Sequence, residues 1–431
     1  MAMHRGAATF TLDTGTCPKW LFERMVKLGR EMVRVLVEEY GPDEFIRRVS
    51  DPVWFQSLGT VLAFDWNASG LTTILTAALK EAIRHEERNL GIFICGGKGK
   101  TSRKTPEEIE RWGQWLDLPG EQTQNLSYNS RMAAKVDSAL VQDGFQLYHH
   151  SFFFSKNGAC PHTYVAQLSI AAARSGEHVR EEKRICSRCG HEKGKPQRNI
   201  GVGAWAVVQQ GMNQNEQSAR RYHWYSESVY DLVCEPHTGI SSQSVGNRVL
   251  NLVSRTSNDT RERSTELVGA GYRPLMKEIT ILRRHASRLS KMFAIREQGG
   301  EQLTLLKLED TEFSYHPVLA EDFSRSTYLE KILSRVTQEK PQSYEKLVAT
   351  PGVGPKTVRA LALVAEVIYG AKPSYEDPAR YSFAHGGKDA TPYPVDRKTY
   401  DQTIGMLHHA VRRMRVSPIE KERMIKGITC A

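Results

Sequence analysis

Two strand-like segments separated by a long basic stretch constrain the fold of this chain most strongly. Residues 145–154 form a continuous run of aromatic and β-compatible residues and are followed by Asn157-Gly158, a typical hairpin dipeptide; residues 204–208 form the second segment. Without residues 160–203 the chain reads FFFSKNGAAWAVVQQG, which predicts an antiparallel hairpin. We therefore expect residues 160–203 to be an insertion at the hairpin tip, where extra chain is tolerated because the tip is exposed.

The remainder of the chain is mainly helical by pattern. Apolar residues recur at helical spacing over residues 20–40, and the apolar run 90–95 fits a buried strand. A chain of 431 residues is expected to form two or three folding units. We predict an α+β fold in which residues 1–335 form a mixed helix and sheet core, interrupted by 160–203, and residues 336–431 form an all-helical domain.

Charge and hydropathy narrow the class of protein. Lys and Arg total 59 against 49 Asp and Glu, and the formal net charge of +10 favours a polyanionic partner. Residues 160–203 hold eight basic and four acidic side chains, so much of this excess lies in the insertion. No apolar run approaches the roughly 18 residues of a membrane span, which excludes a membrane protein. Seven scattered cysteines and an N-terminus without an apolar leader predict a cytoplasmic protein.

Residues 347–361, LVATPGVGPKTVRAL, carry the most specific local motif. They resemble the helix-hairpin-helix of DNA-repair proteins, in which a Gly-x-Gly turn and the next helix N-terminus present backbone amides to phosphate oxygens. On this resemblance we expect a DNA-binding site made of Gly352, Gly354, Lys356, Thr357 and Arg359. Such contacts hold DNA without reading its sequence. The simpler alternative is a helical connection that uses glycine and proline only to turn.

The same motif is similar to that of base-excision glycosylases of the endonuclease III type. The resemblance implies that Lys356 is a nucleophile that forms a Schiff base with an abasic sugar and that Asp396 assists it. A longer interval between the two residues and the missing iron–sulfur cysteines depart from this pattern. In the alternative interpretation, Lys356 contacts phosphate and Asp396 caps a helix that begins at Arg397.

A cysteine and histidine cluster lies in the insertion. Cys186-Ser187-Arg188-Cys189 resembles one knuckle of a zinc ribbon, and the partners available upstream are Cys160 and His162. The four side chains Cys160, His162, Cys186 and Cys189 predict a structural Zn²⁺ site. The alternative is a basic loop with free thiols and no metal.

Most of the chain outside the insertion resembles a prokaryotic family, domain-of-unknown-function family 763. The resemblance rests on short motifs that include PKWLFERM (18–25), FDW (64–66), GGKG (96–99), KVDS (135–138), QDG (142–144), YHH (148–150), RRYHW (220–224) and EPHTG (235–239). These motifs are rich in residue types that bind metals or transfer protons. The candidate catalytic residues are Asp65, Asp137, Asp143, His149, His150, His223 and His237.

Within this set, Asp65, Asp137 and His149 are the candidate ligands for Mg²⁺ or Mn²⁺, ions that activate water for phosphodiester hydrolysis. Strand alternation places His149 and His150 on opposite faces. The alternative to a catalytic role for each of these side chains is a structural one, in which it forms hydrogen bonds at the surface or in the core.

The basic, glycine-rich residues 96–104 lack the spacing of a nucleotide-binding P-loop. We expect Lys98, Lys100 and Arg103 to hold a DNA phosphate instead.

Together these features predict a DNA-processing protein, specifically a metal-dependent nuclease that holds DNA through its helix-hairpin-helix. Two alternatives stay open: a DNA glycosylase or abasic-site lyase that uses Lys356 and Asp396, and a DNA-binding protein without catalysis. DNA is the expected partner, and the sequence leaves open whether the chain forms a homodimer.

Overall fold

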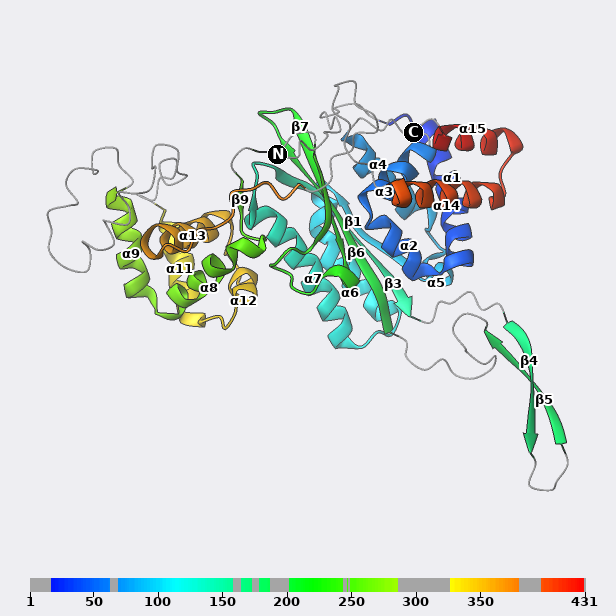
Figure 1. The fold of residues 1–431 in the computed structure, drawn as a ribbon, viewed down its shortest axis with the longest axis horizontal. Helices are drawn as coiled ribbons and strands as arrows, with labels where there is room; N and C mark the ends of the chain where they lie inside the picture. Colours follow the sequence, from blue (N-terminus) through cyan, green and yellow to red (C-terminus); the bar gives the residue numbers. More distant parts are fainter. Residues whose placement is uncertain are drawn as a thin grey trace.

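A five-stranded antiparallel sheet lies at the centre of the protein (Figure 1). The structure is a computed structural model that describes residues 17–62, 69–157, 164–172, 178–186, 201–242, 246, 249–285, 326–379 and 397–429. The strand order is β1-β3-β6-β7-β8, and every neighbouring pair is antiparallel. The strands are β1 (Ile92–Lys98), β3 (Gln146–Asn157), β6 (Gly201–Asn213), β7 (Ser218–Tyr225) and β8 (His237–Ser242).

The strands predicted at 90–95, 145–154 and 204–208 are confirmed by β1, β3 and β6, although β1 starts only at Ile92 because Leu90 ends a short helix. All of β7 and most of β6 are buried because helices cover both faces of the sheet. This double cover also encloses polar side chains of these strands, such as Gln209 on β6 and Arg221 on β7, which are buried between the sheet and the helices.

The first face of the sheet is covered by helices from both ends of the chain. Side chains such as Ile92, Phe153 and Val208 point from the sheet into this layer. Helix α3 begins where Asp51 accepts hydrogen bonds from the backbone amides of Val53 and Trp54. The helices are α1 (Lys19–Tyr40), α2 (Pro42–Val49), α3 (Pro52–Val61), α4 (Gly70–Ala82), α14 (Arg397–Arg413) and α15 (Pro418–Thr429).

The opposite face packs against a second group of helices. Phe93, Phe152 and Trp224 belong to the same cluster of buried side chains as these helices. In Figure 1, α7 lies between the sheet and the group formed by α8, α9 and α11 to α13. The helices are α6 (Thr105–Trp115), α7 (Gly120–Ala139), α8 (Asn258–Gly269), α9 (Tyr272–His285), α11 (Thr327–Glu339), α12 (Tyr344–Ala349) and α13 (Pro355–Tyr369).

Short elements complete the connections. The two-stranded pair of β2 (Val141–Gln142) and β9 (Leu250–Asn251) follows α7, and Asn251 also bridges to Ser374. The remaining elements are α5 (Glu87–Leu90), η1 (Gly99–Lys104), η2 (Ser226–Ser228) and η3 (Arg255–Ser257). No helix in the described ranges combines the length and apolar character needed to cross a membrane.

The helices of residues 336–431 are divided between the two clusters. The buried side chains of α12 and α13 pack with those of α8 and α9, whereas those of α14 and α15 pack with those of α1 and α3. The structure is α+β with helices in its C-terminal region, as the sequence predicts. The predicted division at residue 335 and the identity of 336–431 as one domain stay predictions.

The segment between β3 and β6 contains its own hairpin. Strands β4 (Tyr164–Ala172) and β5 (His178–Cys186) pair with each other in a separate two-stranded sheet. Figure 1 shows this hairpin lying beyond the ends of β3 and β6. The last residue of β3, Asn157, lies opposite the first residue of β6, Gly201, so the two ends of the intervening segment start side by side.

Candidate nucleic-acid interface

A cavity of about 500 Å³ opens between η1, α7 and β3. We call it the basic cavity, because Arg103, Arg131 and Lys135 lie in its walls and no aspartate or glutamate of the described residues lines it. Arg131 and Lys135 are one helical turn apart on α7, so they project on the same side of that helix. A cavity with several cations and no carboxylate in its walls is suited to an anionic ligand such as phosphate.

Lys135 stands at the edge of this cavity and is half-buried. Its Nζ donates a hydrogen bond of 2.7 Å to the backbone carbonyl of Thr350, and no carboxylate of the described residues pairs with it. Burial lowers the pKa of Lys135 to about 8, because a desolvated ammonium group loses the stabilisation that water gives its charge.

Behind the basic cavity, Asp137 is completely buried and accepts three hydrogen bonds. The donors are Gln209 Nε2 at 2.5 Å, Trp224 Nε1 at 3.1 Å and His237 Nε2 at 2.5 Å. Since tryptophan can only donate and the carboxylate oxygens accept from all three groups, Asp137 orients the amide of Gln209 and the ring of His237.

A chain of hydrogen bonds continues from Asp137 to the floor of the cavity. Gln209 gives its amide hydrogen to Asp137, so its Oε1, 2.9 Å from His150 Nδ1, is an acceptor. His150 Nδ1 therefore carries the proton, and His150 Nε2 accepts from the Ser130 hydroxyl at 2.8 Å. Burial lowers the pKa of His150, which agrees with a neutral ring in this chain.

The loop between α12 and α13 is fastened to α7 and β2 beside the basic cavity. This loop, residues 350–354, carries the glycines of the predicted hairpin, and Val353 is buried beneath it. The fastening hydrogen bonds join Tyr128 to Glu345 (2.5 Å), Lys135 to the Thr350 carbonyl (2.7 Å), Gln142 to the Pro355 carbonyl (3.0 Å) and Arg359 to Gln142 (2.5 Å). The loop and the cavity therefore belong to one continuous surface.

The two glycines of this loop have different structural roles. Gly352 has a φ of +91°, and an added Cβ would lie 2.4 Å from Ile332 Cδ1, so folding requires a glycine there. Gly354 has an extended backbone, and an added Cβ would meet no atom within 4 Å. Folding therefore places no steric demand for glycine at position 354.

The predicted DNA-binding side chains are not equally accessible. Lys356 is exposed at the start of α13, whereas Thr357 is only 2% exposed, so its side chain is not accessible to DNA. Arg359 is half-buried and donates to Gln142, so it holds the loop to the body of the protein. Lys98 and Lys100 are exposed at the end of β1 and in η1, next to Arg103, which lines the cavity.

Of the predicted catalytic residues, Asp137, His150 and His237 are linked by hydrogen bonds through the core, whereas Asp143, His149 and His223 are not part of that chain. His149 and His150 lie on opposite faces of β3, as the alternation predicts: His149 Nε2 contacts the hydroxyls of Thr76 and Ser151, while His150 faces α7. His223 is fully buried between the Val49 carbonyl and Arg221.

Asp143 belongs to a buried ion cluster. Arg220 donates to Asp143 Oδ2 at 2.9 Å and to both oxygens of Asp377, at 2.9 and 2.7 Å. The hydroxyl of Tyr222 also donates to Asp143, at 2.6 Å. The oxygens of Asp143 therefore accept hydrogen bonds inside the protein, so this carboxylate is not placed as an accessible catalytic group.

The predicted Mg²⁺ or Mn²⁺ site is only partly within the described residues, because Asp65 lies outside them. Asp137 and His149 are not brought together: Asp137 lies on the α7 side of the sheet and His149 on the α4 side. No group of three or more His, Cys, Asp or Glu side chains in the described ranges is placed to hold a metal ion. Metal binding by this set stays a prediction.

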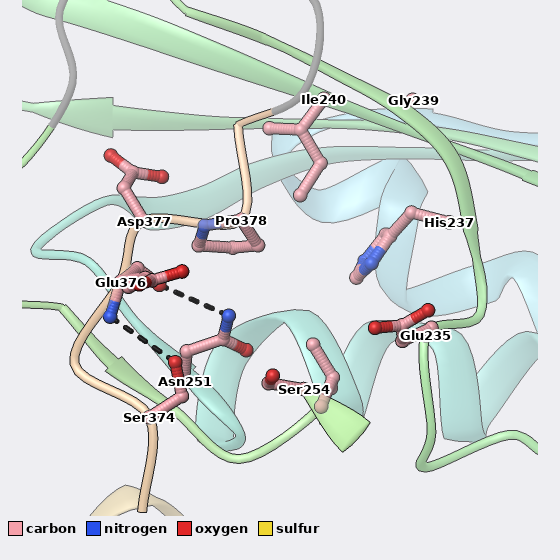
Figure 2. A pocket seen from close by; sticks show the side chains of 11 residues that line it. Glu235, His237, Gly239, Ile240, Asn251, Ser254, Ser374, Glu376, Asp377 and Pro378 are labelled. Carbon is pink, nitrogen blue, oxygen red and sulfur yellow. Dashed lines mark hydrogen bonds between the residues drawn. The ribbon is translucent and has the colours of Figure 1, made fainter. Parts of the chain in front are cut away.

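A second, smaller cavity of about 210 Å³ lies beside β8 (Figure 2). His237 and Glu235 lie on one side of it, and Asn251 and Glu376 lie on the other. His237 reaches this cavity while its Nε2 is bonded to Asp137. The hydrogen-bonded chain from Ser130 to His237 therefore connects the two cavities through the core.

The predicted zinc ligands fall mostly outside the described residues. Cys160, His162 and Cys189 lie outside them, and Cys186 is the last residue of β5. The zinc site therefore stays a prediction, and so does the predicted lyase pair, because Asp396 also lies outside.

Elemental analysis of the purified protein tests the zinc site. We expect about one equivalent of zinc per chain, bound by the thiolates of the insertion, and its loss in a Cys186→Ser, Cys189→Ser double variant. Cys234→Ser, which changes a cysteine of the body, should keep the metal. Zinc below about a tenth of an equivalent in the unmodified protein would contradict the site.

The fold and site define an α+β protein with a basic cavity next to a glycine-containing helix–loop–helix. The chain belongs to the family described as Protein of unknown function (DUF763), whose model matches residues 6–170 and 200–395. The unmatched residues 171–199 lie inside the segment 160–203. Comparison with curated proteins and with solved structures gave no match.

Sequence reasoning missed four residues of this site: Ser130, Arg131, Lys135 and Gln209. Arg131 and Lys135 carried a usable signal, because two cations at i and i+4 on a helix share one face. Ser130 and Gln209 carried none, since their importance depends on contacts with His150 and Asp137 that only the packing of α7 on the sheet creates.

Proposed function

We propose that this protein is a DNA-processing protein that holds the sugar–phosphate backbone between the basic cavity and the loop 350–354. The hydrogen bond from Lys135 to the Thr350 carbonyl carries this proposal, because it joins a wall of the cavity to the loop. Phosphates along one strand could then contact both features at once.

The charges of this surface support an anionic partner. No ion pair within the described residues neutralises Arg103, Arg131 or Lys356, and all three are exposed. Cations of this kind bind phosphates with release of counterions, so affinity falls steeply as salt rises. We expect binding that depends on salt and varies little with DNA sequence.

Gly354 is the sharpest probe of this surface. Its extended backbone and the open space around it mean that alanine fits without strain, but a phosphate approaching the amides at the start of α13 would meet the new methyl group. We expect Gly354→Ala to weaken binding of every duplex by at least about tenfold, or roughly 1.4 kcal/mol. Fluorescence anisotropy with labelled duplexes of unrelated sequence measures this.

The matched control is Gly405→Ala in α14, where an added Cβ also meets nothing within 4 Å. This variant should bind DNA like the unmodified protein. Equal affinity of Gly354→Ala and the unmodified protein would show that the loop does not hold DNA. Gly352→Ala is unsuitable for this purpose, because it disturbs packing against Ile332.

Backbone cleavage by a Mg²⁺- or Mn²⁺-dependent reaction stays a prediction from the sequence. Incubation of labelled duplex with each metal, and with EDTA, tests it directly. Cutting that requires the metal supports the nuclease; binding without cutting under any metal condition supports a DNA-binding protein without this activity.

A further inference from the structure

Lys135 combines features that an exposed, charge-paired lysine lacks. Its amine is half-buried at the edge of a cavity, its one hydrogen bond among the described residues goes to a carbonyl, and no carboxylate there stabilises its positive charge. Burial of the amine disfavours its charged form, because a desolvated ammonium group loses the stabilisation that water provides. More of this amine is therefore uncharged near neutral pH than in an exposed lysine, and an uncharged amine is a nucleophile.

The groups around Lys135 indicate which kind of electrophile its amine would attack. The arginines of the basic cavity, together with the adjoining loop 350–354, suit a deoxyribose phosphate backbone. The cavity itself is lined by short or flat side chains such as Ser130 and Tyr148. A deoxyribose that has lost its base opens to an aldehyde at C1′, which is a carbonyl that an amine attacks.

We propose that Lys135 forms an imine with the C1′ aldehyde of an abasic site in DNA held at the basic cavity. This inference rests on the proposed function, since it requires DNA at that surface. It assigns the amine to α7 rather than to Lys356, which is exposed on α13.

The chemistry needs no oxidant, reductant or metal. The Lys135 nitrogen bonds to C1′ and the aldehyde oxygen leaves as water, which gives a protonated imine. A water molecule then takes a proton from C2′, the C2′–C3′ double bond forms, and the C3′–O bond breaks, so the 3′ phosphate leaves with the electron pair of that bond. Water hydrolyses the imine and returns the free lysine.

Borohydride trapping of the full-length protein tests the inference. A duplex with one abasic site is incubated with the protein in EDTA and sodium borohydride, which reduces the imine to a stable amine. We expect a covalent protein–DNA adduct, and peptide mass spectrometry should place the modification on Lys135. An adduct on Lys356 or on any other lysine would overturn the assignment.

Two lysine-to-arginine variants test the role of the Lys135 amine separately from that of its positive charge. Lys135→Arg keeps a cation that can donate to the Thr350 carbonyl, so we expect it to bind the abasic duplex but to form no adduct. Lys277→Arg, an exposed lysine on α9, should form the adduct like the unmodified protein. Binding of intact duplex is measured in parallel: protein that binds DNA but gives no adduct refutes the imine alone, whereas absence of binding refutes the proposed function and the imine with it.

Discussion

Replacing Asp137 with alanine is expected to lower the free energy of unfolding by at least about 3 kcal/mol. The reason is that three buried donors, on Gln209, Trp224 and His237, would lose their acceptor together, and each unsatisfied buried donor costs about 1–3 kcal/mol. The chain from Gln209 to Ser130 would also lose the group that orients it. Urea denaturation followed by circular dichroism measures the change.

Ser138→Ala is the matched control for Asp137→Ala. Ser138 is the next residue of α7 but is exposed, and its one hydrogen bond among the described residues goes to the Lys135 carbonyl of its own helix. Its replacement should change the unfolding free energy by no more than about 0.5 kcal/mol. If Asp137→Ala were equally mild, the three hydrogen bonds would not hold this part of the core together.

Replacing Asp377 with alanine is expected to destabilise the protein by about 3–5 kcal/mol, the usual cost of removing one partner of a buried ion pair. Arg220 would keep its hydrogen bond to Asp143 but lose both of its hydrogen bonds to Asp377. The Arg220 side chain is only 1% exposed to water. The backbone amides of Gly246 and Ala379 would also lose the carboxylate that accepts their hydrogen bonds. Thermal and urea denaturation both report this loss.

Glu376→Ala provides the comparison for Asp377→Ala. Glu376 is the preceding residue, and its carboxylate forms no ion pair within the described part of the chain. We expect a change within about 0.5 kcal/mol. Similar stability of the two variants would mean that Arg220 does not fasten the segment after α13 to β7.

The strands were predictable because their pattern is local. A run of aromatic and β-compatible residues of strand length followed by Asn157-Gly158 indicates a strand and a turn without knowledge of any partner. The helix at residues 20–40 was predictable for the same reason, since its apolar spacing matches α1. Distribution of the C-terminal helices was not predictable in this way, because α14 is amphipathic whether it packs on α13 or on α1.

The candidate site was less predictable than the fold. The sequence marked Asp137, His149 and His150 by residue type, but type does not show that Asp137 accepts three hydrogen bonds or that His149 faces away from it. The spacing of Arg131 and Lys135 predicts that they share one helix face, but only the packing of α7 shows that this face borders a cavity. Accessibility and partners are properties of packing, and residues distant in sequence supply them.

The sequence alone determined the strand and helix pattern, the position of the interrupted hairpin and the glycine-containing loop at 350–354, because these depend on backbone conformation and local periodicity. Only the tertiary structure decided that Lys135 contacts Thr350, more than two hundred residues away, and that a cavity lies beside them in which no carboxylate of the described residues takes part. Burial and charge pairing set the chemistry of a side chain, and both arise when distant segments pack together.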